Sequence, residues 1–126
     1  MAKFREVFEH PEFKRDKKQL TKRFRTLEDD LDNLINYSIY SYHKCNIDNK
    51  GIFRIPGLGF ENPPVYKVRK FACKALKGKG AQTGLRLIYA YLKDEDRIEL
   101  VEIYFKEKQS TECDKGRIKR RYFESV

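Results

Sequence analysis

Three segments in the second half of the chain alternate apolar and polar residues as β-strands do, and no other pattern constrains the fold as strongly. They span residues 65–74, 84–92 and 97–105. The polar residues 93–96 separate the last two segments, which predicts a compact turn between antiparallel strands. The linker before residue 84 is longer and rich in glycine and lysine, so we expect an irregular loop there. The pattern predicts an antiparallel meander.

The first half of the chain is predicted to contain one strand followed by two helices. Residues 3–8 alternate as a short strand. Pro11 suits a first helical position, and apolar residues recur at helical spacing through residues 11–24 and again through 27–44. We expect these helices to form an antiparallel hairpin that packs on one face of an antiparallel sheet. The predicted fold is a single α+β domain over residues 1–126.

Two further regions have weaker patterns. Residues 45–64 are rich in Asn, Asp, Gly and Pro, and within them residues 52–55 are strand-like. The basic residues 116–123 are expected to form a short helix or a disordered tail. Strict alternation would place Glu99 and Glu102 on opposite faces of the last strand, and we interpret them as ion-pair partners of neighbouring basic residues.

Positive charge is concentrated in one part of the chain. The formal net charge is +9, and residues 62–93 contain eight basic residues and no acidic residue. These are Lys67, Arg69, Lys70, Lys74, Lys77, Lys79, Arg86 and Lys93. Because this run is also strand-like, the charge is expected to form a fixed positive surface, which attracts polyanions. A nucleic acid or an acidic protein is therefore the expected class of partner.

The strand pattern separates these cations into two groups. Lys67 and Arg69 are two residues apart and therefore project to the same side of their strand. For an isolated pair, a solvated sheet face is the simpler interpretation. Arg86 favours an anion-binding face instead, because it begins a strand that is otherwise apolar or aromatic. Lys106 and Lys108, at the end of the last strand, can close the same patch.

Other kinds of site have little support in the sequence. Cys45, Cys73 and Cys113 are an odd number of thiols without C-x-x-C spacing, which indicates reduced cysteines in the cytosol. The histidines, His10 and His43, do not complete the spacing of a metal site, so no metal or other cofactor is expected. No Gly-x-Ser-x-Gly motif is present. The order of residues in KGKGAQTG also differs from that of a Walker phosphate-binding loop, so we expect a basic loop that approaches a phosphate backbone or is simply solvated.

No membrane segment is predicted. No apolar run approaches the roughly 18 residues that a spanning helix needs. The first ten residues, MAKFREVFEH, lack the apolar centre of a secretion signal. We therefore expect a cytoplasmic protein with no membrane partner.

Several motifs occur in an order that is typical of one family. They are YKVR at 66–69, GLRLIY at 84–89 and IYFKEK at 103–108, after the helical segments HPEFKRDKKQL and RFRTLEDDLDNL. In this combination, which covers most of the chain, the sequence resembles the RelE/ParE superfamily of bacterial toxins, in particular its RelE-like or HigB-like mRNA-cleaving branch. The resemblance implies a RelE-like fold in which the sheet presents a concave basic face.

The same resemblance implies a function and a set of site residues. Members of the branch are toxins of type II toxin–antitoxin systems that cleave mRNA on the ribosome without a metal and are inhibited by a cognate antitoxin. The ribose 2′-OH attacks the adjacent phosphate. By position in the motifs, Lys67 corresponds to the base, Arg86 to the residue that stabilises the transition state, and Arg69 to a supporting cation. A lysine base must be neutral, and neighbouring cations disfavour the charged ammonium.

Further residues are expected to bind the substrate around this centre. The loop lysines Lys74, Lys77 and Lys79 would guide the RNA, and Tyr104, Lys106 and Lys108 would contact it from the last strand. Two alternatives remain open: a ParE-like toxin that inhibits a topoisomerase, and a noncatalytic protein that binds RNA or the ribosome. The set Lys67, Arg69 and Arg86 favours the nuclease, because a purely interacting surface does not require converging cations.

Overall fold

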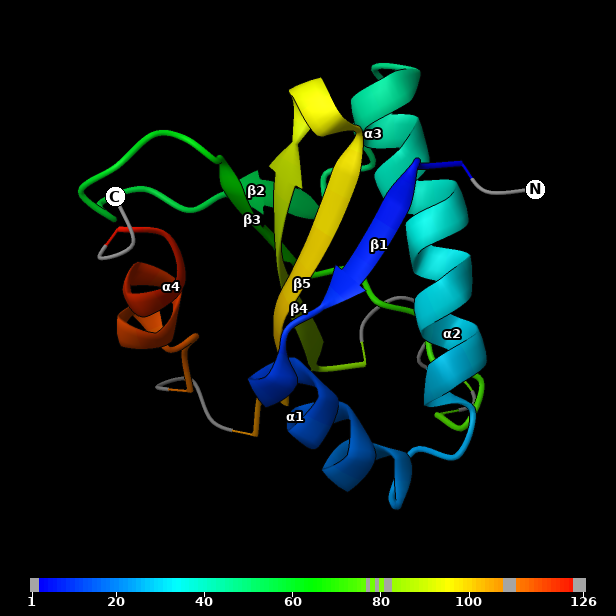
Figure 1. Ribbon diagram of the computed structural model, residues 1–126. Helices are drawn as coiled ribbons and strands as arrows, with labels where there is room; N and C mark the ends of the chain where they lie inside the picture. The colour runs from blue at the N-terminus through cyan, green and yellow to red at the C-terminus, as the bar shows by residue number, and fades with distance from the viewer. Residues whose placement is uncertain (1–2, 77, 79, 81–82, 108–110, 124–126) are drawn as a thin grey trace.

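The strands of the described chain form one mixed sheet, in the order β1-β5-β4-β3-β2. The computed structural model describes residues 3–76, 78, 80, 83–107 and 111–123. The strands are β1 (Glu6–Glu9), β2 (Ile52–Arg54), β3 (Val65–Val68), β4 (Leu85–Leu92) and β5 (Arg97–Phe105). The antiparallel meander of β3, β4 and β5 is confirmed (Figure 1), and a 3-10 turn, η2 (Lys93–Glu95), joins the last two.

β1 shows that the prediction of a purely antiparallel sheet is wrong, because it lies parallel to β5. Glu6 pairs with Arg97 and Glu9 with Leu100. A tight turn requires antiparallel pairing, whereas strands joined by a long connection can pair in either direction. β1 and β5 are separated by most of the chain, so their relative direction leaves no local pattern in the sequence.

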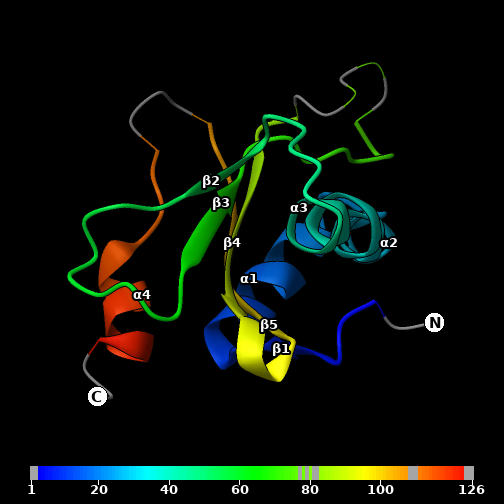
Figure 2. The same ribbon diagram turned by 90° about the horizontal axis from the view of Figure 1, so that it is seen from above.

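Helices cover both faces of the sheet (Figure 2). The first half contains α1 (Pro11–Thr21), α2 (Leu27–Asn33), η1 (Leu34–Ile39) and α3 (Tyr40–Lys44). The last three are continuous, because the backbone at the junctions of the π-helical stretch η1 stays right-handed helical. This confirms the predicted helical pair. The opposite face carries α4 (Lys115–Tyr122), so residues 116–123 are largely helical and not a disordered tail.

Each face of the sheet buries its own apolar cluster. The cluster on the side of α2 and α3 includes Phe13, Leu31, Val68, Leu87 and Tyr89. The cluster on the side of α4 includes Val65, Ile88, Ala90, Ile118 and Tyr122. Alternation along β4 divides its residues between the two, so this central strand is apolar on both sides. The face that was expected to be open and basic is therefore covered in part by α4.

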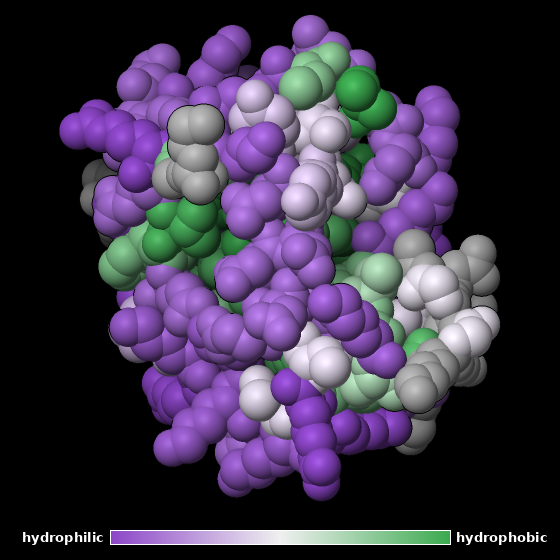
Figure 3. Space-filling model, turned by 90° about the vertical axis from the view of Figure 1, so that its right-hand side faces the viewer, coloured by the Kyte–Doolittle hydropathy of each residue, from purple (hydrophilic) through white to green (hydrophobic). Residues whose placement is uncertain are grey.

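The helical face itself is hydrophilic on its outer side. On the view that Figure 3 gives of this face, hydrophilic side chains predominate and apolar ones are visible in separate patches. The apolar stripe of the long helix points inward instead, and Leu31, Ile35 and Ile39 are buried. Within the residues that the structure describes, no helix has the length and apolar character to cross a bilayer.

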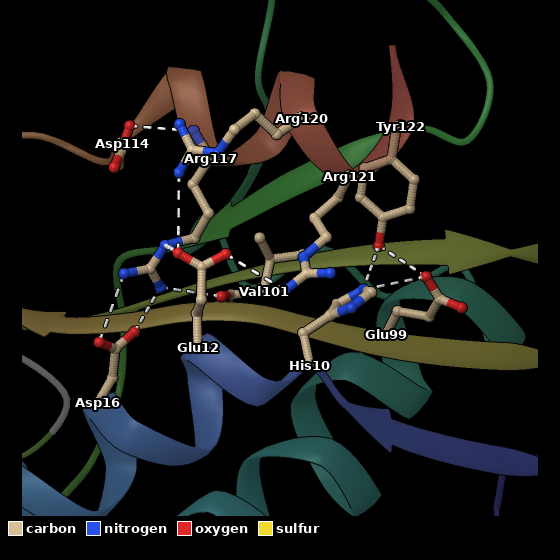
Figure 4. Close-up of polar contacts among 10 residues, drawn as sticks. All are labelled: His10, Glu12, Asp16, Glu99, Val101, Asp114, Arg117, Arg120, Arg121 and Tyr122. Carbon is tan, nitrogen blue, oxygen red and sulfur yellow. Dashed lines mark hydrogen bonds and ion pairs between the residues drawn. The ribbon is translucent and has the colours of Figure 1, made fainter. Parts of the chain in front are cut away.

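Polar contacts hold α4 against β5 and α1 (Figure 4). Asp114 caps the helix, since its Oδ1 accepts a hydrogen bond from the backbone N–H of Arg117 at 3.0 Å. Arg117 Nη1 lies 2.6 Å from Asp16 Oδ2 of α1. At the other end, the Tyr122 hydroxyl donates to Glu99 Oε1 at 2.7 Å. These contacts, together with the buried Ile118, hold α4 against the face of the sheet opposite to α2 and α3.

A bulge in β5 corrects the expected placement of its two acidic residues. Ile88 pairs with Glu102 but Tyr89 pairs with Leu100, so Val101 is an extra residue in the strand. Both glutamates consequently reach the side of α4. Glu99 binds Tyr122, and Glu102 accepts the backbone N–H of Asp114 at 2.9 Å. The expectation that they lie on opposite faces is wrong.

Candidate nucleic-acid interface

Cations from neighbouring strands surround two adjoining pockets on the side of the sheet that α4 partly covers. One pocket, of about 530 Å³, is lined by Lys67, Arg69 and Phe53 together with Arg54, Ile55, Pro56, Glu112, Cys113 and Lys115. The other, of about 450 Å³, is lined by Arg69, Arg86 and Phe53 together with Lys50, Lys70 and Gly84. Arg69 and Phe53 belong to both pockets. We call these two pockets the basic groove.

Strand pairing determines how the predicted catalytic residues are arranged. Lys67 lies in β3 between Phe53 of β2 and Ile88 of β4. Arg69 follows β3 and is kept beside β2 because its backbone N–H donates to Gly51 O at 2.7 Å. Lys67 and Arg69 line the first pocket, whereas Arg69 and Arg86 line the second. Arg69 is therefore the cation that the two pockets share. Lys67 and Arg86 lie on either side of it and do not line a common pocket.

Arg86 is held close to another positive charge. Its Nη1 donates to the carbonyl oxygens of Arg69 at 3.3 Å and Leu85 at 3.1 Å. Burial, followed by the charge on Arg69, lowers the pKa of Arg86. Two guanidinium groups that are held near each other are stabilised when an anion lies between them. The second pocket is therefore suited to a phosphate group.

An acidic residue that the sequence did not reveal lies beside Lys67. The Lys67 Nζ donates to Glu112 Oε2 at 2.9 Å, and Lys106 Nζ is 3.5 Å from Glu112 Oε1. The hydrogen bond from Lys67 is the main reason why the pKa of Glu112 lies below its ordinary value. The carboxylate of Glu112 thus binds the two lysines, Lys67 and Lys106, that an incoming phosphate would otherwise contact.

Tyr104 lies on β5, next to Arg86 of the groove. It pairs with Arg86 across β4 and β5, and its half-buried ring packs against the cluster on the side of α4. Burial raises the pKa of its hydroxyl. Tyr104 therefore lies next to Arg86, and Lys106 next to Glu112, but neither residue lines the basic groove, and their contact with RNA stays a prediction.

The predicted RNA-guiding loop is only partly described. Lys77, Lys79 and Lys108 lie outside the described residues. The backbone N–H of Lys74 donates to Asp30 Oδ2 of α2 at 3.1 Å, and its side chain lines a pocket beside that helix. Lys74 is therefore placed against the helical layer and does not line the basic groove.

β3 is shorter than predicted, which explains the position of Lys74. The strand predicted over residues 65–74 ends at Val68. Beyond it, Phe71 and Cys73 enter the helix-side core, although simple alternation would place them on the side of Lys67. Side chains at the start of α2 take over the backbone hydrogen bonds here, since Thr26 Oγ1 accepts the N–H of Ala75 at 3.0 Å.

Several residues of the groove were missed by reasoning from the sequence. They are Lys50, Phe53, Arg54, Lys70, Glu112 and Lys115. A signal existed for Phe53, because residues 52–55 are strand-like and alternation separates the buried Ile52 from the exposed Phe53. Glu112 had no such signal, since its position depends on the path of the chain between β5 and α4.

Comparison with known proteins adds nothing to this geometry. No protein-family model, curated protein or solved structure matches the chain. Among the described residues, no group of three or more His, Cys, Asp or Glu side chains could hold a metal ion. The function must therefore be inferred from the basic groove itself.

Proposed function

We propose that the chain is the toxin of a type II toxin–antitoxin system with a RelE-like fold, and that it cleaves mRNA on the ribosome. The observation that supports this most is the convergence of Lys67, Arg69 and Arg86 on two adjoining pockets. A cognate antitoxin would then be its protein partner. Arginine and lysine side chains from β3, from the segment just after it and from β4 are held beside one another on the sheet, which is what binding and reacting at a phosphate diester requires.

In the proposed reaction, the reacting phosphate of the mRNA lies at Arg69, the cation that the two pockets share, so that Lys67 and Arg86 approach it from the first and the second pocket. The 2′-oxygen forms a bond to phosphorus, and the bond from phosphorus to the 5′-oxygen breaks, leaving a 2′,3′-cyclic phosphate. Lys67, once neutral, accepts the proton of the 2′-OH. Arg69 and Arg86 donate hydrogen bonds to the non-bridging oxygens as negative charge develops there. The 5′-oxygen takes a proton from the solvent as it leaves.

Glu112 must leave Lys67 before this reaction, because an ammonium in an ion pair has no lone pair to accept a proton. A phosphate that enters the groove competes with the carboxylate for Lys67 and Lys106. Once Glu112 is displaced, Lys67 is released from its ion pair and can contact the 2′-OH of the RNA. Glu112 is thus proposed to occupy the groove in the free protein.

The substitution Glu112→Gln is expected to strengthen RNA binding, because it removes a negative charge that competes with phosphate. We expect an increase in affinity of roughly 3- to 10-fold at low salt, and a smaller one at high salt, where the charge is screened. Binding of a single-stranded oligoribonucleotide at two ionic strengths measures this. Glu107→Gln is the control, because Glu107 is also exposed but pairs with Arg23 and lines neither pocket of the groove. Equal affinities for Glu112→Gln and wild type would contradict the role given to Glu112.

The proposed function is tested by inducible expression with mapping of mRNA ends. We expect growth arrest and new mRNA ends within translated regions, and neither after the substitution Arg86→Ala. Growth arrest without new mRNA ends would reject the nuclease and favour the ParE-like alternative, in which a topoisomerase is inhibited.

One observation favours a second candidate, a noncatalytic protein that binds RNA or the ribosome. The ion pair of Lys67 with Glu112 makes Lys67 a donor and not a base in the structure. Ribosome binding without new mRNA ends, in wild type and in Glu112→Gln alike, would favour this candidate.

A further inference from the structure

Phe53 is an exposed aromatic ring at the centre of the basic groove. It lies in β2 opposite Lys67, its side chain lines both pockets, and 44% of the residue is exposed. The guanidinium carbon of Arg69 is 5.7 Å from the centre of its ring. Phe53 is therefore in contact with the cation that the two pockets share.

Packing does not account for a phenylalanine at this position. Its neighbour Ile52 is 3% exposed and supplies the apolar contact of β2 with the helix-side core. The ring of Phe53 points to the other side, where the charged residues of the first pocket are four cations and one acid: Arg54, Lys67, Arg69, Lys115 and Glu112. Leaving a large apolar ring in water has a cost in stability, since burial is what makes apolar surface favourable.

An exposed aromatic ring between cations is the arrangement that binds single-stranded nucleic acids. Bases of any sequence stack on aromatic rings, while the cations bind the backbone phosphates on either side. Here Lys67, Arg54 and Lys115 line the pocket on one side of Phe53. Lys50, Lys70 and Arg86 line the pocket on the other side. The ring thus separates two places that suit phosphate groups.

We propose that Phe53 is the stacking platform for a nucleobase of single-stranded RNA, and that phosphates next to this base occupy the two pockets. Arg69 would lie next to both the stacked base and its phosphate. The inference rests on the proposed function, since it assigns a residue of the same groove. It adds a contact with the base to a site whose other contacts are with phosphate.

The substitution Phe53→Ala should weaken the binding of a short oligoribonucleotide of mixed sequence by roughly 5- to 140-fold, the effect expected for one stacked base. Phe53→Tyr should retain most of the affinity, because it keeps an aromatic ring. Phe123→Ala is the matched control: Phe123 is 49% exposed, and its ring packs against Phe60 beside α4. It should bind as wild type does.

An abasic oligoribonucleotide of the same length separates stacking from charge. We expect wild type and Phe53→Ala to bind this probe equally, because it offers phosphates but no base. The chain contains no tryptophan, so Phe53→Trp introduces a single fluorescent reporter. Its emission should be quenched by the base-containing RNA and not by the abasic one, whereas that of Phe123→Trp should change with neither.

The outcomes distinguish this inference from the proposed function. If wild type binds neither RNA nor ribosomes, both are overturned. If wild type binds RNA and Phe53→Ala binds it equally well, only the stacking role is overturned, and the edge strand β2 remains as a surface for a protein such as the antitoxin. An equal loss of affinity for the abasic and the complete RNA would also overturn stacking, because the substitution would then have disturbed the phosphate sites.

Discussion

Replacing Lys67 with alanine is expected to slow mRNA cleavage by about 10²–10⁴-fold, the usual contribution of a group that transfers a proton. Two properties of the structure support so large an effect. Lys67 lies on a strand that is paired on both sides, and it lines the first pocket of the basic groove together with Arg69. The measurement is the rate at which cleaved ends appear on ribosomes programmed with a single mRNA.

Two further variants assign the role of Lys67. Lys67→Arg keeps the positive charge but cannot accept a proton at neutral pH, so it should be nearly as slow as Lys67→Ala if Lys67 is the base. Lys44→Ala is the matched control, because Lys44 also forms an ion pair, 2.7 Å from Asp96, with a side chain that is 29% exposed against 22% for Lys67. It should cleave at the wild-type rate. Full activity of Lys67→Arg would contradict the base and leave Lys67 as a phosphate ligand.

The sequence predicted those elements whose formation depends on local pattern. β5 begins and ends where alternation begins and ends, at residues 97 and 105. The long helix also follows its apolar spacing closely. The elements that were predicted poorly depend on distant parts of the chain. The direction of β1 is set by β5. The strand predicted as far as residue 74 ends at Val68, and the backbone of Lys74 and Ala75 binds Asp30 and Thr26 of the helical layer instead.

The same distinction applies to the candidate site. Alternation places Lys67 and Arg69 on one side, and the pairing of β3 with β4 brings Arg86 near them. These positions follow from periodicity and from a meander. Glu112 lies 45 residues after Lys67 and meets it only because α4 returns the chain to this face. Phe53 lies in the site because the three-residue strand β2 pairs with β3, which places it opposite Lys67. The alternation of residues 52–55 was a signal for Phe53, whereas the contact of Glu112 leaves no periodic pattern.

Stability is expected to fall by up to about 3 kcal/mol between pH 6.5 and pH 4, because of His43. Burial lowers the pKa of His43 from 6.5 to about 4. Its Nε2 is 2.7 Å from the hydroxyl of Tyr89, which is fully buried, and its ring packs against Tyr66 and Tyr91. In this pH interval the unfolded chain binds a proton that the folded protein does not bind. Unfolding therefore becomes more favourable as the pH falls.

The substitution His43→Gln should remove this pH dependence, since glutamine does not titrate and can still hydrogen-bond to Tyr89. Urea unfolding at a series of pH values measures the free energy in wild type and variant. The slope of this free energy against pH should be flat for the variant between pH 6.5 and pH 5, above the interval in which Glu99 titrates. An unchanged slope would contradict the assignment to His43, even if the variant were less stable at every pH.

Glu99 provides the control, because it titrates in a different pH interval. Hydrogen bonds from His10, Tyr122 and Arg97 lower its pKa from 4.5 to about 2. A carboxylate with a lowered pKa stabilises the folded protein above pH 4.5, and this stabilisation is lost as the pH falls toward 2. Glu99→Gln should therefore leave the slope between pH 6.5 and pH 4.5 as it is in wild type and flatten it below pH 4. Loss of the upper slope in Glu99→Gln would mean that the docking of α4, and not His43, determines the sensitivity to acid.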